Sequence, residues 1–194
     1  MSEKKHLRRI NAVAPIRICD IGGWTDTWFA EFGSVFNIAV YPYVEVQITP
    51  VPIDEHAERV FINVENYDDH YVFKPLTECE YGKHPLIESA IGEMNLPEDI
   101  AFSVNIFSTA PPGASTGTSA AVSIALIGAL DKLTDGCLTA HEASMMAHDI
   151  ETNRLQLQCG IQDQLASAYG GINYIQMMCY PHAVVSPVMI PDAV

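Results

Sequence analysis

The chain has 194 residues, of which 48% are hydrophobic and 18% are charged. This composition is ordinary for a folded domain, so an intrinsically disordered chain is not expected. The formal net charge of −14, with only 10 lysine and arginine residues, argues against nucleic acid or an anionic membrane as a partner, because both recruit clustered basic side chains.

The N-terminal half of the chain is rich in β-branched and aromatic residues, which favour strands. The first strand is expected over residues 9–21, where Pro15 predicts a bulge or a sheet edge, because proline cannot donate to the hydrogen-bond ladder. Further strands are predicted over residues 35–49, 60–64, 71–73 and 101–107. Helical spacing first occurs at residues 85–94 and ends at Asn95 and Pro97.

The C-terminal half carries the stronger helical patterns. A run of small apolar residues at 119–133 predicts a buried helix. Thr139 and Glu142 have the spacing of a capping box, which predicts a helix that extends to about residue 155. A further helix is expected from Gln162 to the glycines at 170–171, and strands are expected over residues 172–178 and 184–190. This order of elements predicts an α+β domain, in which a mixed or antiparallel sheet has helices packed on one face.

Two further classes are disfavoured by the distribution of apolar residues and cysteines. No stretch approaches the ~20 apolar residues of a membrane helix, and the N-terminus lacks an apolar core followed by a cleavage site. We therefore expect a cytoplasmic protein without a membrane partner. The five cysteines are scattered and never form a CxxC pair, which favours reduced thiols over a disulfide framework or a zinc site.

A run of small residues separates the predicted strand at 101–107 from the predicted helix at 119–133. It reads Pro111-Pro112-Gly113-Ala114-Ser115-Thr116-Gly117-Thr118-Ser119-Ala120-Ala121. The unpaired N–H groups and the dipole at a helix start hold phosphate oxygens, and small residues let the backbone approach them closely. The run lacks the Gly-Lys-Ser/Thr ending of a Walker loop. It therefore predicts a phosphate-binding loop, with a flexible turn before a capped core helix as the alternative.

Two other clusters suit a small polar ligand. The first contains Arg17 and the run Gly22-Gly23-Trp24-Thr25-Asp26-Thr27, which combines a cation, a glycine turn, an aromatic ring and a carboxylate. The second pairs Glu151 with the run Gly160-Ile161-Gln162-Asp163-Gln164, so that two carboxylates flank a glycine break between helices. A simple turn, a core aromatic residue and solvated helix charges are the structural alternatives. Three such clusters in one short chain favour a functional site.

Together these motifs resemble the GHMP kinase superfamily, named for galactokinase, homoserine kinase, mevalonate kinase and phosphomevalonate kinase. The family loop usually reads Pro-x-Gly-x-Gly-Leu-Gly-Ser-Ser-Ala; here Ser115 and Thr116 replace Gly-Leu, and Thr118 replaces the first serine. The Gly-Gly-Trp-Thr-Asp-Thr run is most similar to sugar kinases acting on fucose or heptose phosphate. Galactokinases have Gly-Glu-His-Thr-Asp in that place.

The resemblance implies a fold and a domain organisation. Residues 1–194 are expected to form the N-terminal ATP-binding and substrate domain of a GHMP kinase, with the ribosomal protein S5 domain 2-like fold. Family members normally continue into a second domain with a third, glycine-rich motif. No counterpart of that motif follows in this chain, so we expect either a fragment that lacks the C-terminal GHMP domain or a divergent short member, and we favour the fragment.

The resemblance also implies a role for each cluster. Asp163 is expected to take the proton of the attacking hydroxyl, while Arg17 stabilises this carboxylate and offsets the charge on the transferred phosphoryl group. Mg²⁺ is expected at Ser119 and Glu151. The ATP phosphates are expected on the backbone of Pro112, Gly113, Ala114, Ser115, Thr116, Gly117, Thr118 and Ser119. The substrate is expected at Gly23, Trp24, Asp26 and Gly160.

The predicted activity is transfer of the γ-phosphate of ATP to a hydroxyl of a sugar or sugar phosphate, by analogy the anomeric one. A decarboxylase of diphosphomevalonate type and a catalytically inactive nucleotide- or sugar-binding module are the alternatives. The predicted partners are ATP, Mg²⁺ and a small sugar. The oligomeric state stays open, with a homo-oligomer among the alternatives.

Overall fold

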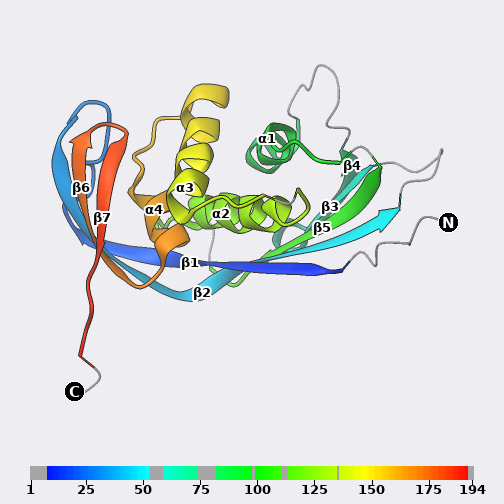
Figure 1. Ribbon diagram of the computed structural model, residues 1–194, viewed down its shortest axis with the longest axis horizontal. Helices are drawn as coiled ribbons and strands as arrows, with labels where there is room; N and C mark the ends of the chain where they lie inside the picture. The colour runs from blue at the N-terminus through cyan, green and yellow to red at the C-terminus, as the bar shows by residue number, and fades with distance from the viewer. Residues whose placement is uncertain are drawn as a thin grey trace.

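The computed structural model describes residues 8–52, 59–73, 82–97, 99–110, 113–134 and 136–191, which form one seven-stranded sheet with helices on one face (Figure 1). The strands are β1 (Ile10–Ile21), β2 (Gly33–Pro52), β3 (Val60–Val64), β4 (Asp69–Phe73), β5 (Ile100–Ser108), β6 (Ile172–Cys179) and β7 (His182–Pro187). The helices are α1 (Pro85–Glu93), α2 (Thr118–Asp131), α3 (Ala140–Asp149) and α4 (Gln162–Tyr169). The predicted α+β class is confirmed.

The long strand β2 connects the two halves of the sheet. The strand order is β4-β3-β5-β2-β6-β7, with β1 paired to β2. The first part of β2 pairs with β6 and its last part with β5, both antiparallel, while β3 and β5 form a parallel pair. The register between β1 and β2 shifts between Pro15 and Ile16, so the bulge predicted at Pro15 is confirmed.

Most element boundaries agree with the sequence patterns. The capping box of α3 is present, because Thr139 Oγ1 accepts from the Glu142 N–H at 3.2 Å and Glu142 Oε2 accepts from the Thr139 N–H at 2.8 Å. The helix predicted to reach residue 155 continues past α3 as a π-helical turn, Ile150–Arg154. The strand predicted over 184–190 is wrong at both ends: β7 starts at the hairpin turn and stops at Pro187, since proline removes a ladder donor.

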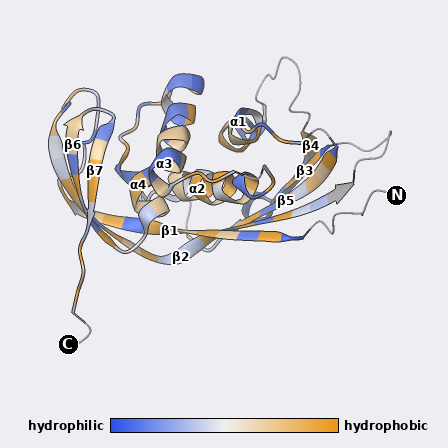
Figure 2. Ribbon diagram, in the orientation of Figure 1, coloured by the Kyte–Doolittle hydropathy of each residue, from blue (hydrophilic) through white to orange (hydrophobic). Residues whose placement is uncertain are grey.

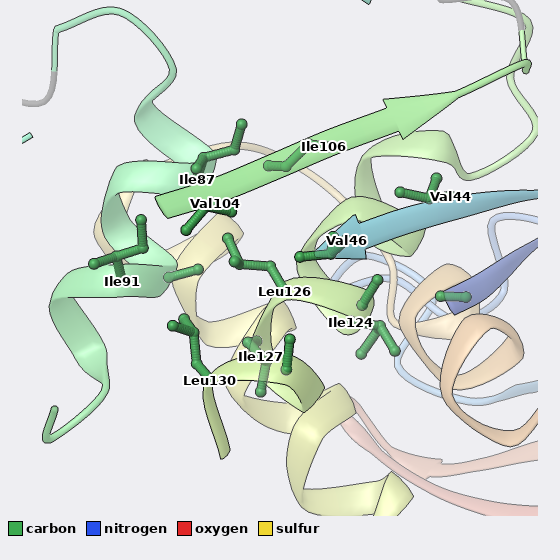
Figure 3. Packing of buried hydrophobic residues seen from close by; sticks show 14 of the residues in the cluster. Val44, Val46, Ile87, Ile91, Val104, Ile106, Ile124, Leu126, Ile127 and Leu130 are labelled. Atoms are coloured by element: carbon green, nitrogen blue, oxygen red, sulfur yellow. The ribbon is translucent and has the colours of Figure 1, made fainter. Parts of the chain in front are cut away.

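The main core lies between the sheet and the buried helix α2 (Figure 3). Leu126, Ile127 and Leu130 of α2 pack between the strands and α1, whose Ile87 and Ile91 face them. Figure 2 shows that α2 is largely apolar along its length, as expected of a helix surrounded by other elements. Even α2 has only 14 residues. Across the described ranges, no helix has the length and apolarity that a bilayer crossing requires.

A second, smaller apolar cluster packs α4 against the half of the sheet where β2 pairs with β6. Ile161 and Leu165 are fully buried there against Val35 of β2 and Ile175 of β6. Because α4 begins directly after Ile161, this packing determines where the first turn of α4 lies. The first turn carries Asp163.

Candidate active site

The three predicted clusters meet in one cavity of about 870 Å³. Its walls come from β1 and the turn that follows it, from the loop before α2, and from the segment that leads into α4. Every predicted site residue that the structure describes lines this cavity: Arg17, Gly23, Trp24, Asp26, Gly113, Ala114, Ser115, Thr116, Gly117, Thr118, Ser119, Glu151, Gly160 and Asp163. Pro112 lies outside the described residues.

The N-terminus of α2 opens into the cavity without a side-chain cap. Its N-cap is Gly117, whose φ of 71° is a left-handed conformation that glycine adopts readily. A Cβ at Gly117 would also lie 3.3 Å from Asp163 Oδ2. Whereas a capping box satisfies the start of α3, no described side chain caps the start of α2. The first N–H groups of α2 are thus available to an anion.

Arg17 joins the loop to the start of α4. Its Nε and Nη2 both lie 2.7 Å from Asp163 Oδ1, and its Nη1 donates to the Ser115 carbonyl at 2.6 Å. The Arg17 backbone N–H also donates to the Thr116 carbonyl, at 3.0 Å. One side chain therefore sets the distance between the loop and Asp163, and it leaves the second oxygen of Asp163 beside Gly117.

Asp26 is buried beneath the start of α4. Its side chain is 1% exposed, and its Oδ2 accepts from the Gln162 N–H at 2.9 Å. Burial raises the pKa of the Asp26 carboxyl, and the hydrogen bond from Gln162 partly offsets that rise. Asp26 was predicted to contact the substrate. That contact stays a prediction. The structure shows a structural role that the sequence did not indicate, because the Asp26 carboxylate accepts the first N–H of α4.

Glu151 reaches the cavity from the π-helical turn. It is 6% exposed, and its Oε1 accepts from Gln164 Nε2 at 2.9 Å. Burial raises the pKa of Glu151, the Gln164 amide lowers it, and the nearby Asp163 raises it again. A π-helical turn within an α-helix often marks a functional position. Its occurrence here had no signal in the local sequence.

A buried polar chain holds the irregular segment between the π-helical turn and α4. Tyr180 Oη donates to the Cys159 carbonyl at 3.2 Å and lies 2.8 Å from His148 Nε2. Burial lowers the pKa of His148 to about 4 and raises that of Tyr180 to about 12, so the ring is neutral and the phenol protonated near pH 7. Cys159 is thus tied to both α3 and the β6–β7 turn. This anchors Gly160, which follows it.

A largely apolar part of the cavity wall was missed by sequence reasoning, and we call it the apolar end. It consists of Val64, Tyr67, Leu86, Ile87 and Ile106, from β3, the 3-10 turn Glu65–Tyr67, α1 and β5, with the polar residues Asn66, His84 and Ser108 among them. Four of these positions have an ordinary core pattern in the sequence, whereas Tyr67 lies in a polar turn and is 59% exposed. Only the tertiary arrangement brings them to the cavity wall.

Two oxygen donors on the cavity wall, at Ser119 and Glu151, are of the type that Mg²⁺ prefers. Within the described ranges, no group of three or more His, Cys, Asp or Glu side chains could enclose an ion. Mg²⁺ in phosphoryl-transfer sites needs fewer, since one or two carboxylates, water and the phosphates complete its shell. The Ser119 hydroxyl and the buried Glu151 carboxylate, both on the cavity wall, are hard oxygen donors of this type.

Among known protein families, residues 85–171 match the one described as "GHMP kinases N terminal domain". The chain is 29% identical over 93 residues to a D-glycero-alpha-D-manno-heptose 7-phosphate kinase of Campylobacter jejuni, covering 48% of this chain and 27% of that protein. It is 37% identical over 111 residues to a mevalonate kinase of Pyrococcus abyssi, and the alignment covers 54% of this chain and 33% of that protein. The chain therefore aligns with about a third or less of these curated relatives.

Solved structures show the same fold. A D-glycero-D-manno-heptose 1-phosphate kinase from Bacteriodes thetaiotaomicron superposes with a TM-score of 0.79 at 24% identity, covering 94% of this chain and 60% of that one. A galactokinase of Lactococcus lactis, complexed with galactose, superposes with a TM-score of 0.74 at 17% identity. This match covers 95% of this chain and 48% of the galactokinase chain.

Proposed function

The chain carries a GHMP kinase N-terminal domain, and from this premise we propose that it is the nucleotide-binding part of an ATP-dependent kinase acting on a hydroxyl of a sugar or sugar phosphate. One observation supports the proposal above the others. Arg17 joins Asp163 to the loop at the uncapped start of α2, with 2.7 Å and 2.6 Å contacts. If the first N–H groups of α2 hold the phosphates and Asp163 is the base, the two lie side by side, as phosphoryl transfer requires.

The cavity has room for the two ends of ATP. The phosphates would lie on the backbone N–H groups of Gly113 to Ser119, where the dipole of α2 favours negative charge. The base would lie at the apolar end, against side chains such as Leu86 and Ile87. Ser119 and Glu151 are the residues that would hold Mg²⁺, which supplies neutralisation of phosphate charge when bound.

Asp163 is the proposed base. The attacking hydroxyl would donate its proton toward the free Oδ2, because Oδ1 already accepts from two Arg17 nitrogens. Arg17 would keep the carboxylate oriented and offset charge that develops on the transferred phosphoryl group. Gly23, Trp24, Asp26 and Gly160 would form the substrate end; Trp24 is 69% exposed at the mouth of the cavity.

A second candidate substrate is mevalonate, which the 37% identity to the Pyrococcus abyssi mevalonate kinase favours. An ADP-release screen of the full-length protein with ATP and Mg²⁺ separates the candidates. We expect release with at least one of fucose, heptose phosphates, galactose or arabinose. ADP release with mevalonate alone would support the second candidate. Release of CO₂ from diphosphomevalonate would support a decarboxylase. ATP binding without turnover would support an inactive binding module.

Replacement of Glu151 by glutamine tests the proposed metal position. Glutamine keeps the shape and an oxygen toward Gln164, but removes the negative charge. We expect the Mg²⁺ concentration for half-maximal activity to rise about 10-fold or more, measured by metal titration at saturating ATP. Glu45→Gln, on the open face of β2, is the matched control and should titrate like wild type. A Glu151→Gln titration that matches the control would identify Glu151 as a structural residue.

A further inference from the structure

Gln162 is the first residue of α4 and carries a buried acceptor without a partner. Its side chain is 8% exposed and lines the cavity. Its backbone is held on both sides, since its N–H donates to Asp26 Oδ2 at 2.9 Å and its carbonyl accepts from Asn37 Nδ2 at 3.4 Å. The side-chain Oε1 nevertheless has no hydrogen-bond partner among the described residues. Buried polar atoms are usually paired. Of the six unpaired side-chain atoms among the described residues, only those of Gln162 and Gln164 belong to residues that line the cavity, which points to a ligand group as the partner.

The amide nitrogen of the same side chain lies near Cys19. The Gln162 amide lowers the pKa of the Cys19 thiol against the larger rise caused by burial. Both groups lie beside Gly23, where an added Cβ would be 3.7 Å from Cys19 Sγ and 3.9 Å from Gln162 Nε2. With Nε2 directed there, Oε1 is left as an acceptor that needs a donor.

The surroundings of Gln162 are rich in acceptors. Asp26, Glu151 and Asp163 line the same part of the cavity. Among the lining residues that the structure describes, Arg17 is the one lysine or arginine, and it is already bound to Asp163 and to the Ser115 carbonyl. Hydroxyl donors suit such a site, whereas a carboxylate or phosphate at this point would face like charge.

We propose that Gln162 Oε1 accepts a hydrogen bond from a second hydroxyl of the phosphoryl acceptor, beside the hydroxyl that Asp163 serves. Gln162 is then a specificity-determining residue that selects a polyhydroxylated, uncharged part of the substrate. This inference rests on the proposed function and deepens it. Sites built to hydrogen-bond a hydroxyl discriminate strongly against analogues that lack it, because the protein acceptor is then left unpaired.

The test compares wild type with Gln162→Met in the full-length protein, using the best sugar acceptor and its single-deoxy analogues. For wild type, one deoxy position should lower kcat/KM about 10-fold or more. In Gln162→Met, removal of the hydroxyl at that position should hardly lower kcat/KM, while removal of each other hydroxyl should lower kcat/KM as much as in wild type. Gln176→Met, on an exposed position of β6, should keep the whole wild-type profile. Gln162→Asn, which keeps a neutral amide but withdraws its oxygen by one methylene, should also lose the discrimination and covers the case in which the methionine variant does not fold.

The outcomes separate this inference from the proposed function. Turnover of sugars with the same deoxy profile in wild type and in both Gln162 variants would overturn the role of Gln162 and leave the kinase assignment standing. Wild-type protein that neither phosphorylates nor binds any sugar, the latter measured by calorimetry, would overturn both. Loss of discrimination at one and the same position in Gln162→Met and in Gln162→Asn is the result that we expect.

Discussion

Replacement of Asp163 by asparagine should lower kcat by about 10²- to 10⁴-fold, the usual contribution of a positioned general base. Asparagine has the same shape and keeps an oxygen for Arg17, which contacts Asp163 Oδ1 through two nitrogens. What it lacks is a second oxygen that can accept the proton of the attacking hydroxyl. The loss should therefore fall on kcat, while the affinity for ATP stays close to wild type.

The measurement is ADP release at saturating ATP and acceptor, with ATP affinity followed by calorimetry. Asp68→Asn is the matched control: Asp68 is exposed and has a φ of 52°, a conformation that asparagine tolerates well. Its kcat should equal that of wild type. Retention of wild-type kcat by Asp163→Asn would exclude Asp163 as the base. A fall in ATP affinity with unchanged kcat would instead assign it to holding the loop through Arg17.

The fold was largely predictable because its main signals are local. Thr139 and Glu142 form their capping box within one turn, and Pro15 disturbs the ladder at its own position. The apolar run of α2 has a pattern typical of a buried helix, and most of its residues are buried. The two failures have different causes. The π-helical turn at Glu151 has no signal in the local sequence. The end of β7 has one, because Pro187 removes a ladder donor, but the predicted strand extended past it.

The candidate site was predictable only as separate clusters. Motif residues such as Arg17 and Asp163 were identified, and the structure places them in contact although they lie 146 positions apart. The apolar end of the cavity has no sequence signature, since Leu86 and Ile87 belong to an ordinary amphipathic helix. Gln162 was passed over because its unpaired oxygen is visible only once its surroundings are known.

The contact between Gly160 and Asp26 is a further feature that only the structure shows, and it predicts a large effect on stability. A Cβ at Gly160 would lie 1.9 Å from Asp26 Oδ2. Asp26 cannot move aside freely, because it is buried and holds the Gln162 N–H. Gly160→Ala should therefore lower the free energy of unfolding by about 3–5 kcal/mol, the combined cost of overpacking and of a displaced buried carboxylate.

Urea denaturation of Gly160→Ala measures this change, with Gly128→Ala as the matched control. An added Cβ at Gly128 meets nothing within 4 Å, so alanine there should be neutral or stabilise α2 by up to about 1 kcal/mol. The decisive variant combines Gly160→Ala with Asp26→Ala, which removes the clashing oxygen. If the contact is the cause, Gly160→Ala should cost much less in the Asp26→Ala background than in wild type. If Gly160→Ala lowers the free energy of unfolding equally in both backgrounds, Gly160 is required for a reason other than its contact with Asp26.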